Sequence, residues 1–159
     1  MDRLKTEESN PRGIPKAKFL ENIDEYLNKT TATEADVNNF LTELQIRLDQ
    51  YKYMQESKAS SLSSLNQKIP DIENTLETCK FLKSKSESDP EDTIDVDYQL
   101  NDTIYASASI NPITTVSLWL GAGVMLEYPL DEAIDMLNVR LEKTLNNKQI
   151  TIEDLDYLR

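Results

Sequence analysis

A run of heptads between residues 41 and 79 constrains what this chain can fold into more than any other feature. With Leu41 at position a, this stretch contains twelve a and d positions, and ten of them are apolar. The two polar exceptions are Gln55 and Lys58. A pattern sustained for more than five heptads is typical of a coiled coil, in which a narrow apolar seam packs against another helix. The sequence therefore predicts one long helix over this region.

Capping residues and a change in composition mark the ends of this helix. Thr33 and Asp36 are spaced as a capping box, in which each side chain bonds the backbone N–H of the other residue. The acidic stretch at residues 86–92 contains Pro90 and predicts a linker. We therefore expect the first coiled-coil helix at residues 33–87, with a kink at Pro70. At roughly 1.5 Å per residue it would be about 80 Å long, so it must project from any compact body.

Two β-hairpins are expected at residues 88–129, because apolar and polar residues alternate there. One alternating run extends from Val96 to Ile110, with a turn at Asn101. The last two strands add Trp119 and Met125 on a second apolar face. One chain has too little material to cover such strands, so another subunit must cover them. The residues expected to be buried only by neighbouring subunits are Ile104, Val116, Leu118, Leu120, Val124 and Leu126.

A second coiled-coil helix is expected at residues 130–159. Pro129 suits a helix start, and Asp131 and Glu132 favour the positive end of the helix dipole. Since the hairpins reverse the chain, the two helices are expected to pair antiparallel, with Arg159 beside residue 58. That pairing leaves residues 33–57 without a partner in this chain. The expected fold class is α+β, a long antiparallel helical coiled coil interrupted by two β-hairpins.

The N-terminal segment, residues 1–32, is expected to contain a short amphipathic helix. Residues 1–14 are polar and contain Pro11 and Gly13, which indicates a flexible stretch. From Pro15 onwards apolar residues recur at helical spacing, which predicts a helix over residues 16–28.

The composition argues against catalysis, metal binding and nucleic-acid binding. The chain has no His, the commonest general base and metal ligand, and its one Cys, Cys79, falls on a d position of the seam. The turn Gly121-Ala122-Gly123 lacks the lysine and the further glycines of a phosphate-binding loop. The net charge of −12 repels phosphate backbones, and it either keeps the chain soluble or attracts a basic surface on a partner. We expect no enzymatic activity, no cofactor and no metal, and a packing role for Cys79.

The expected location is the cytoplasm. The N-terminus carries no secretory signal pattern, and no apolar run approaches the ~18 residues of a membrane span. A single Cys fits a reducing compartment.

Motifs spread along the whole chain allow a comparison with a known family. They are Asn10-Pro11-Arg12-Gly13-Ile14-Pro15 at the N-terminus, Tyr51-Lys52-Tyr53-Met54 and Ile69-Pro70-Asp71-Ile72 in the first helix, Leu118-Trp119-Leu120-Gly121-Ala122 and Val124-Met125-Leu126-Glu127-Tyr128 in the last strands, and Asp131-Glu132-Ala133 in the second helix. Together they resemble the alpha-class subunits of the prefoldin chaperones, of the type called subunit 3, and suggest a fungal member. The strand segment is the most specific of these motifs. In that family the second helix runs on for several more turns, so the resemblance implies a second helix that is incomplete here, truncated at the C-terminus.

The resemblance implies a function as well as a fold. Its expected partners are other prefoldin subunits, in a hexamer of two alpha and four beta subunits. Such a complex captures unfolded actin and tubulin chains without ATP and delivers them to the cytosolic chaperonin. The client-binding residues expected on this basis are Phe19, Ile23, Tyr26 and Leu27, unless the short helix that they form folds back to cover the seam.

A second class of function stays open on the residues alone. A structural scaffold or tether could use the same coiled coil as a spacer without binding clients. The strand pairs favour the chaperone, because a simple tether needs only helix.

Overall fold

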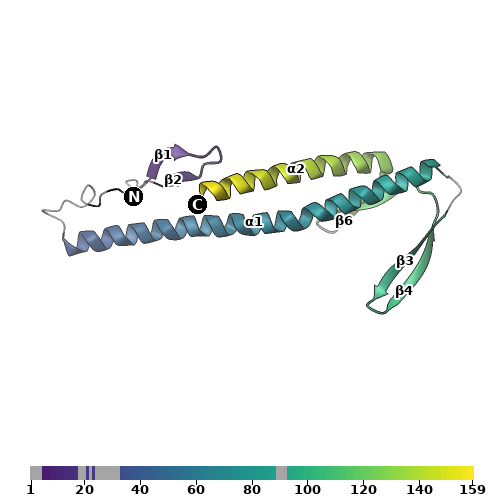
Figure 1. The fold of residues 1–159 in the computed structure, drawn as a ribbon, viewed down its shortest axis with the longest axis horizontal. Coiled ribbons are helices and arrows are strands. Elements are labelled where there is room, and N and C mark those ends of the chain that lie inside the picture. Colours follow the sequence, from purple (N-terminus) through teal and green to yellow (C-terminus); the bar gives the residue numbers. More distant parts are fainter. Residues whose placement is uncertain (1–4, 18–20, 22, 24–32, 89–92) are drawn as a thin grey trace. The chain divides into compact units, whose positions relative to one another are not determined.

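The computed structural model describes residues 5–17, 21, 23, 33–88 and 93–159. Its elements in chain order are β1 (Lys5–Ser9), β2 (Pro15–Ala17), α1 (Glu34–Ser88), β3 (Ile94–Asn101), β4 (Ile104–Ile110), β5 (Thr115–Gly121), β6 (Val124–Pro129) and α2 (Leu130–Tyr157) (Figure 1). The strands pair as three antiparallel hairpins, β1–β2, β3–β4 and β5–β6. The chain divides into two compact units, residues 1–64 with 147–159 (unit 1) and residues 65–146 (unit 2). The expected α+β fold of long helices interrupted by hairpins is confirmed.

Helix α1 begins at the capping box that the sequence predicts. The backbone N–H of Thr33 donates to Asp36 Oδ2 over 2.9 Å, and the N–H of Asp36 donates to Thr33 Oγ1 over 3.4 Å. The bonds from the side chain and backbone of Thr33 lower the pKa of the Asp36 carboxyl. Pro70 lies inside α1 without ending it.

The core of unit 2 lies where the seam of α1 meets α2 and strand β5. Leu76 and Cys79 of α1 are buried together with Leu118 of β5 and with Ala133 and Leu137 of α2. Burying one Leu side chain stabilises the fold by about 1.5–3 kcal/mol. This cluster therefore holds hairpin β5–β6 against the two helices. Cys79 is a core residue, as its heptad position predicts.

Within unit 2 the two helices run antiparallel. Lys83, near the end of α1, forms an ion pair with Asp131 at the start of α2. Earlier on α1, Thr75 lines the same cavity as Met136 and Arg140 of α2. Residues further along α2 therefore lie beside residues earlier in α1, so the two helices are antiparallel, as the sequence predicts.

The turn of hairpin β5–β6 places an alanine, Ala122, where the backbone conformation favours glycine. Ala122 and Gly123 form its two-residue loop, between the paired residues Gly121 and Val124. Both loop residues have a positive φ, 51° for Ala122 and 78° for Gly123. This is the geometry of a type I′ turn, whose twist matches that of the flanking strands. The structure thus places a tight turn where Gly121-Ala122-Gly123 predicts one, with Ala122 in a conformation that favours glycine.

The N-terminal residues form a hairpin where the sequence predicts a flexible stretch. The Asn10 Oδ1 accepts hydrogen bonds from the backbone N–H groups of Arg12, at 3.0 Å, and Ile14, at 2.8 Å. The N–H of Gly13 donates to the Asn10 carbonyl, and Gly13 has a φ of 83°, which glycine adopts without strain. Asn, Pro and Gly stand at the first, second and fourth positions of this turn, where β-turns favour them. The expectation of flexibility is wrong here, because these residues close a turn.

The helix predicted over residues 16–28 is wrong at its start. Residues 16 and 17 belong to strand β2, which pairs with β1. The rest of the predicted helix falls largely on residues 18–20, 22 and 24–32, which lie outside the described residues.

Candidate functional site

Hairpin β5–β6 turns one face towards the helices and exposes the other. Leu118, which pairs with Leu126 across the strands, is only 9% exposed. The next pair along, Trp119 and Met125, is 60% and 55% exposed. Successive residues of a strand point to opposite faces, so Trp119 and Met125 lie on the outer face. An exposed Trp and Met side by side form the kind of patch that marks a protein interface.

The structure corrects the predicted assembly surface at Leu118. The sequence predicts that neighbouring subunits alone bury this residue, yet it packs in the core of its own chain. Val116 packs against the same core, and Leu120 is half-buried. The other predicted residues are exposed, Ile104 by 55%, Val124 by 45% and Leu126 by 47%. Their burial by a neighbouring subunit stays a prediction.

Hairpin β3–β4 also carries exposed apolar residues. Tyr98, Leu100 and Ile104, towards its turn, are 49%, 62% and 55% exposed. A two-stranded hairpin is marginally stable in water unless another element covers its apolar face. This hairpin therefore fits a surface that a second chain covers.

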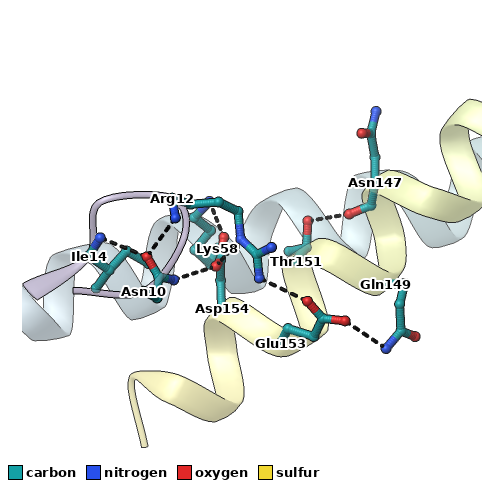
Figure 2. A network of polar contacts seen from close by, with 9 residues as sticks. All are labelled: Asn10, Arg12, Ile14, Lys58, Asn147, Gln149, Thr151, Glu153 and Asp154. Atoms are coloured by element: carbon teal, nitrogen blue, oxygen red, sulfur yellow. Dashed lines mark hydrogen bonds and ion pairs between the residues drawn. The ribbon is translucent and has the colours of Figure 1, made fainter. Parts of the chain in front are cut away.

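A second candidate site lies in unit 1, where the N-terminal turn meets both helices at Asp154 (Figure 2). Asp154 of α2 is fully buried. Its Oδ1 accepts a hydrogen bond from Asn10 Nδ2 at 2.8 Å and another from Arg12 Nε at 2.6 Å. Its Oδ2 accepts one from Lys58 Nζ of α1 at 2.8 Å. One carboxylate therefore joins the N-terminal turn to α1 and α2.

Burial and charge act in opposite directions on Asp154. Burial raises the pKa of its carboxyl, while the hydrogen bonds and positive charges of Lys58 and Arg12 lower it. The bonds prevail, so the pKa lies below the ordinary value of an aspartate. The bond to Asp154, with a weaker contribution from Glu153, raises the pKa of the Arg12 guanidinium. Both shifts favour the charged forms of Asp154 and Arg12, which suits a structural ion cluster rather than an acid or base catalyst.

Further contacts hold the N-terminal hairpin in place and correct the expected pairing of α1. Arg12 Nη2 donates to Glu153 Oε2 at 3.0 Å, and the hydroxyl of Tyr51 donates to the carbonyl of Pro15 at 2.6 Å. The sequence predicts residues 33–57 to lack a partner in this chain, but Tyr51 belongs to that stretch and bonds β2. Lys58 meets Asp154 instead of lying beside Arg159, so the pairing differs from the expected one by five residues of α2, which is about 1.4 helical turns.

The sequence alone does not single out Asp154, although one signal points to it. Lys58 is one of the two polar residues in the seam of α1, and a charge at such a position requires a partner. Of the predicted client-binding residues, Ile23 is 57% exposed. Phe19, Tyr26 and Leu27 lie outside the described residues.

Comparison with known proteins shows which family this chain belongs to. The model of the prefoldin subunit family matches residues 51–159, more than half of the chain. Prefoldin subunit 3 of Saccharomyces cerevisiae is 42% identical over an alignment that covers 100% of this chain and 82% of that protein. This chain belongs to the prefoldin family.

Other prefoldin relatives agree with this assignment. Probable prefoldin subunit 3 of Schizosaccharomyces pombe is 39% identical over 95% of this chain and 83% of that protein. Prefoldin subunit 3 of Homo sapiens is 37% identical over 92% of this chain and 73% of that protein. The predicted resemblance to prefoldins of the subunit 3 type, including fungal ones, is confirmed.

A solved structure supports the prefoldin fold. The chain in the cryo-EM structure of filamentous PFD from Methanocaldococcus jannaschii matches with a TM-score of 0.54 and 17% identity. The match covers 70% of this chain and 88% of that chain.

The described part of this prefoldin subunit offers little to metal or thiol chemistry. No group of three or more His, Cys, Asp or Glu side chains that could hold a metal occurs among its described residues. Burial raises the pKa of the Cys79 thiol, which disfavours the reactive thiolate. Within the described ranges, neither helix combines the length and the apolarity needed to cross a membrane.

Proposed function

We propose that this prefoldin chain is a subunit of a hexamer with two alpha and four beta subunits, and that hairpins β3–β4 and β5–β6 are its contribution to the shared body. The exposed apolar residues of the hairpins give the main support. Leu100, Trp119 and Met125 are each more than half exposed. Apolar surface of this kind is favourably buried when chains associate.

In this proposal the complex captures unfolded proteins in the cytoplasm without ATP, actin and tubulin chains above all, and delivers them to the cytosolic chaperonin. Capture of many non-native chains needs several weak apolar contacts on linked arms, which gain strength through effective concentration. The first half of α1 carries exposed apolar residues, among them Leu41 at 56% and Tyr53 at 74%. No covalent bond changes in this function, so the chain acts without a catalytic group.

The aggregation of denatured actin tests this function. The complex is reconstituted from this chain and the other prefoldin subunits, and light scattering follows denatured actin after dilution. We expect the complex to suppress aggregation equally with and without ATP, and the other subunits without this chain to suppress it less. A complex that assembles fully but leaves aggregation unchanged would contradict the chaperone function and favour a scaffold or tether.

A further inference from the structure

The net negative charge of this chain is concentrated around hairpins β3–β4 and β5–β6, because basic residues are absent there. Eleven of the 29 acidic residues, and none of the 17 basic residues, fall between Ser86 and Val139. That segment has a formal charge of −11, while the rest of the chain has −1. The net charge of −12 is therefore almost entirely a property of the segment that contains strands β3 to β6.

Two of these carboxylates are held on an exposed face of hairpin β3–β4. Asp95 and Asp97 are two residues apart on β3 and so share a face. Each accepts a hydrogen bond from the serine directly opposite on β4, Asp95 from Ser109 and Asp97 from Ser107. No ion pair joins either carboxylate to a Lys or Arg among the described residues. These hydroxyl bonds orient the carboxylates without neutralising their charge.

A third carboxylate lies next to the exposed aromatic residue of hairpin β5–β6. Glu127 lies two residues from Met125 on β6, and Met125 pairs with Trp119, so all three share the outer face. Glu127 Oε1 accepts a hydrogen bond from Thr115 Oγ1 of β5 at 2.5 Å. A carboxylate beside an exposed indole suits an arginine, whose planar guanidinium can stack on the ring and donate to the carboxylate.

We propose that these carboxylate faces bind a different protein chain, another subunit of the same complex, whose facing surface carries Arg and Lys side chains. The inference rests on the proposed function, because it names the chemistry of the partner at the assembly surface. Complementary charge speeds the encounter of two such surfaces and sets their pairing. The exposed apolar residues on the same hairpins then supply the buried contact area.

The same charges exclude a second copy of this chain from the site. Two copies would bring Asp95, Asp97 and Glu127 of one chain towards carboxylates of the other, with no basic residue between Ser86 and Val139 to offset them. Juxtaposed like charges disfavour an interface, and they are a common means of rejecting wrong partners. The hairpins are apolar enough to associate and acidic enough to require an unlike partner.

A charge-neutral variant with an intact fold tests the inference. The variant Asp95→Asn, Asp97→Asn, Glu127→Gln removes three charges, while each amide oxygen can still accept its hydroxyl bond. A matched control, Glu43→Gln, Glu56→Gln, Glu73→Gln, removes three charges from exposed positions of α1. Stopped-flow fluorescence measures the association of each form with the other prefoldin subunits, purified together without this chain, from low salt to about 1 M, where the Debye length is about 3 Å.

The wild type and the control are expected to associate at least tenfold faster at low salt than the hairpin variant, since electrostatic steering is worth about 10- to 10³-fold. High salt should bring the three rates together. Equal rates for the hairpin variant and the control, or self-association of the wild-type chain through its hairpins at low salt, would overturn the inference while leaving the proposed function intact. If no form binds the other subunits at any salt concentration, the proposed function fails as well.

Discussion

Asp154 shows how much one side chain can determine in a fold built from long helices. Fully buried charged residues are rare unless they are paired, because removing a charge from water is unfavourable. Asp154 meets this requirement with three donors, each within 2.8 Å, from the N-terminal turn and α1. Its role depends on position rather than residue type, since the same carboxylate on a surface contributes little.

The substitution Asp154→Asn should destabilise unit 1. It removes the carboxylate that pairs with Lys58 and leaves Arg12 with Glu153 alone. Breaking a fully buried pair costs about 3–5 kcal/mol, but these two side chains are 37% and 30% exposed, so we expect a loss of about 2 kcal/mol in the free energy of unfolding. Urea unfolding followed by circular dichroism measures it. The control is Asp156→Asn, at an exposed carboxylate that pairs with Arg159, and an equal loss in both variants would refute the role of Asp154.

Acid should abolish the contribution of Asp154 to stability. Its pKa is lowered in the folded state, so its stabilising effect is complete above the ordinary aspartate pKa of about 4 and is lost as pH falls through the lower folded-state value. The difference in unfolding free energy between wild type and Asp154→Asn should therefore be constant from about pH 7 to 5 and shrink below about pH 4. The comparison cancels other acids, such as Asp36, that titrate in both proteins. A difference in unfolding free energy that grows in acid would show that folding raises the pKa of Asp154 instead of lowering it.

In some elements of this chain the local residues favour the observed backbone conformation, and in others tertiary pairing imposes it. The β5–β6 turn is the clearest case of the second kind. Its backbone requires a positive φ at both loop positions, yet only Gly123 of the two is a glycine. The flanking strands, paired from Thr115 to Gly121 and from Val124 to Pro129, hold Ala122 in that conformation. Tertiary pairing here outweighs the local preference of one residue.

The substitution Ala122→Gly should stabilise the protein by about 1 kcal/mol, because it relieves a left-handed backbone conformation. Thermal unfolding of the chain measures the change. The matched control is Ala106→Gly in strand β4, where φ is not positive and the same change should destabilise by about 0.5–1 kcal/mol. Two shifts of the same sign would contradict this explanation of the turn.

The two faces of hairpin β5–β6 should respond differently to substitution. Leu118→Ala removes a core residue and should lower the unfolding free energy of the isolated chain by about 2–4 kcal/mol. Trp119→Ser with Met125→Ser changes the outer face and should leave that free energy nearly unchanged while weakening assembly with other subunits. Unfolding of the chain alone and sedimentation of the reconstituted complex separate the two effects. Normal assembly of the double variant would place the interface elsewhere.

The sequence predicts those elements whose signal is local and repeated. Heptads give α1, alternation gives the four central strands, and the spacing of Thr33 and Asp36 gives the start of α1. The N-terminal hairpin is not predicted, because Pro11 and Gly13 by themselves indicate a flexible stretch. The bonds from Asn10 and Arg12 to Asp154, a residue far along the chain, are not visible in the local sequence. The burial of Leu118 is not predicted either, since alternation shows that a strand has two faces but not which of them meets the helices.

At the scale of the whole molecule, the sequence predicts that apolar residues of the N-terminal segment bind clients. The triple substitution Phe19→Ser, Ile23→Ser, Leu27→Ser should weaken capture of denatured actin by the reconstituted complex. Assembly and thermal stability should stay unchanged, because a client-binding surface is free until a client arrives. Light scattering, sedimentation and thermal unfolding provide the three measurements.

The opposite results would redirect the assignment. Unchanged capture would show that these residues do not bind clients. A fall in thermal stability would show instead that the segment covers the seam of its own helix.

The hydrogen bond between Asn10 and Asp154 joins residues 144 positions apart, and this separation has a consequence for how the protein is made. A ribosome that adds about 5–20 residues per second needs roughly 7–29 s to travel from one residue to the other. Arg12 is already synthesised for almost all of that interval, and Lys58 for about its last two thirds, while the carboxylate of Asp154 does not yet exist. A nascent chain that stalls inside α2 can therefore carry every residue of unit 2 and still be unable to close unit 1. Docking of the N-terminal turn is a late event in biosynthesis, and protection of that turn from proteolysis would mark the moment at which residue 154 has emerged.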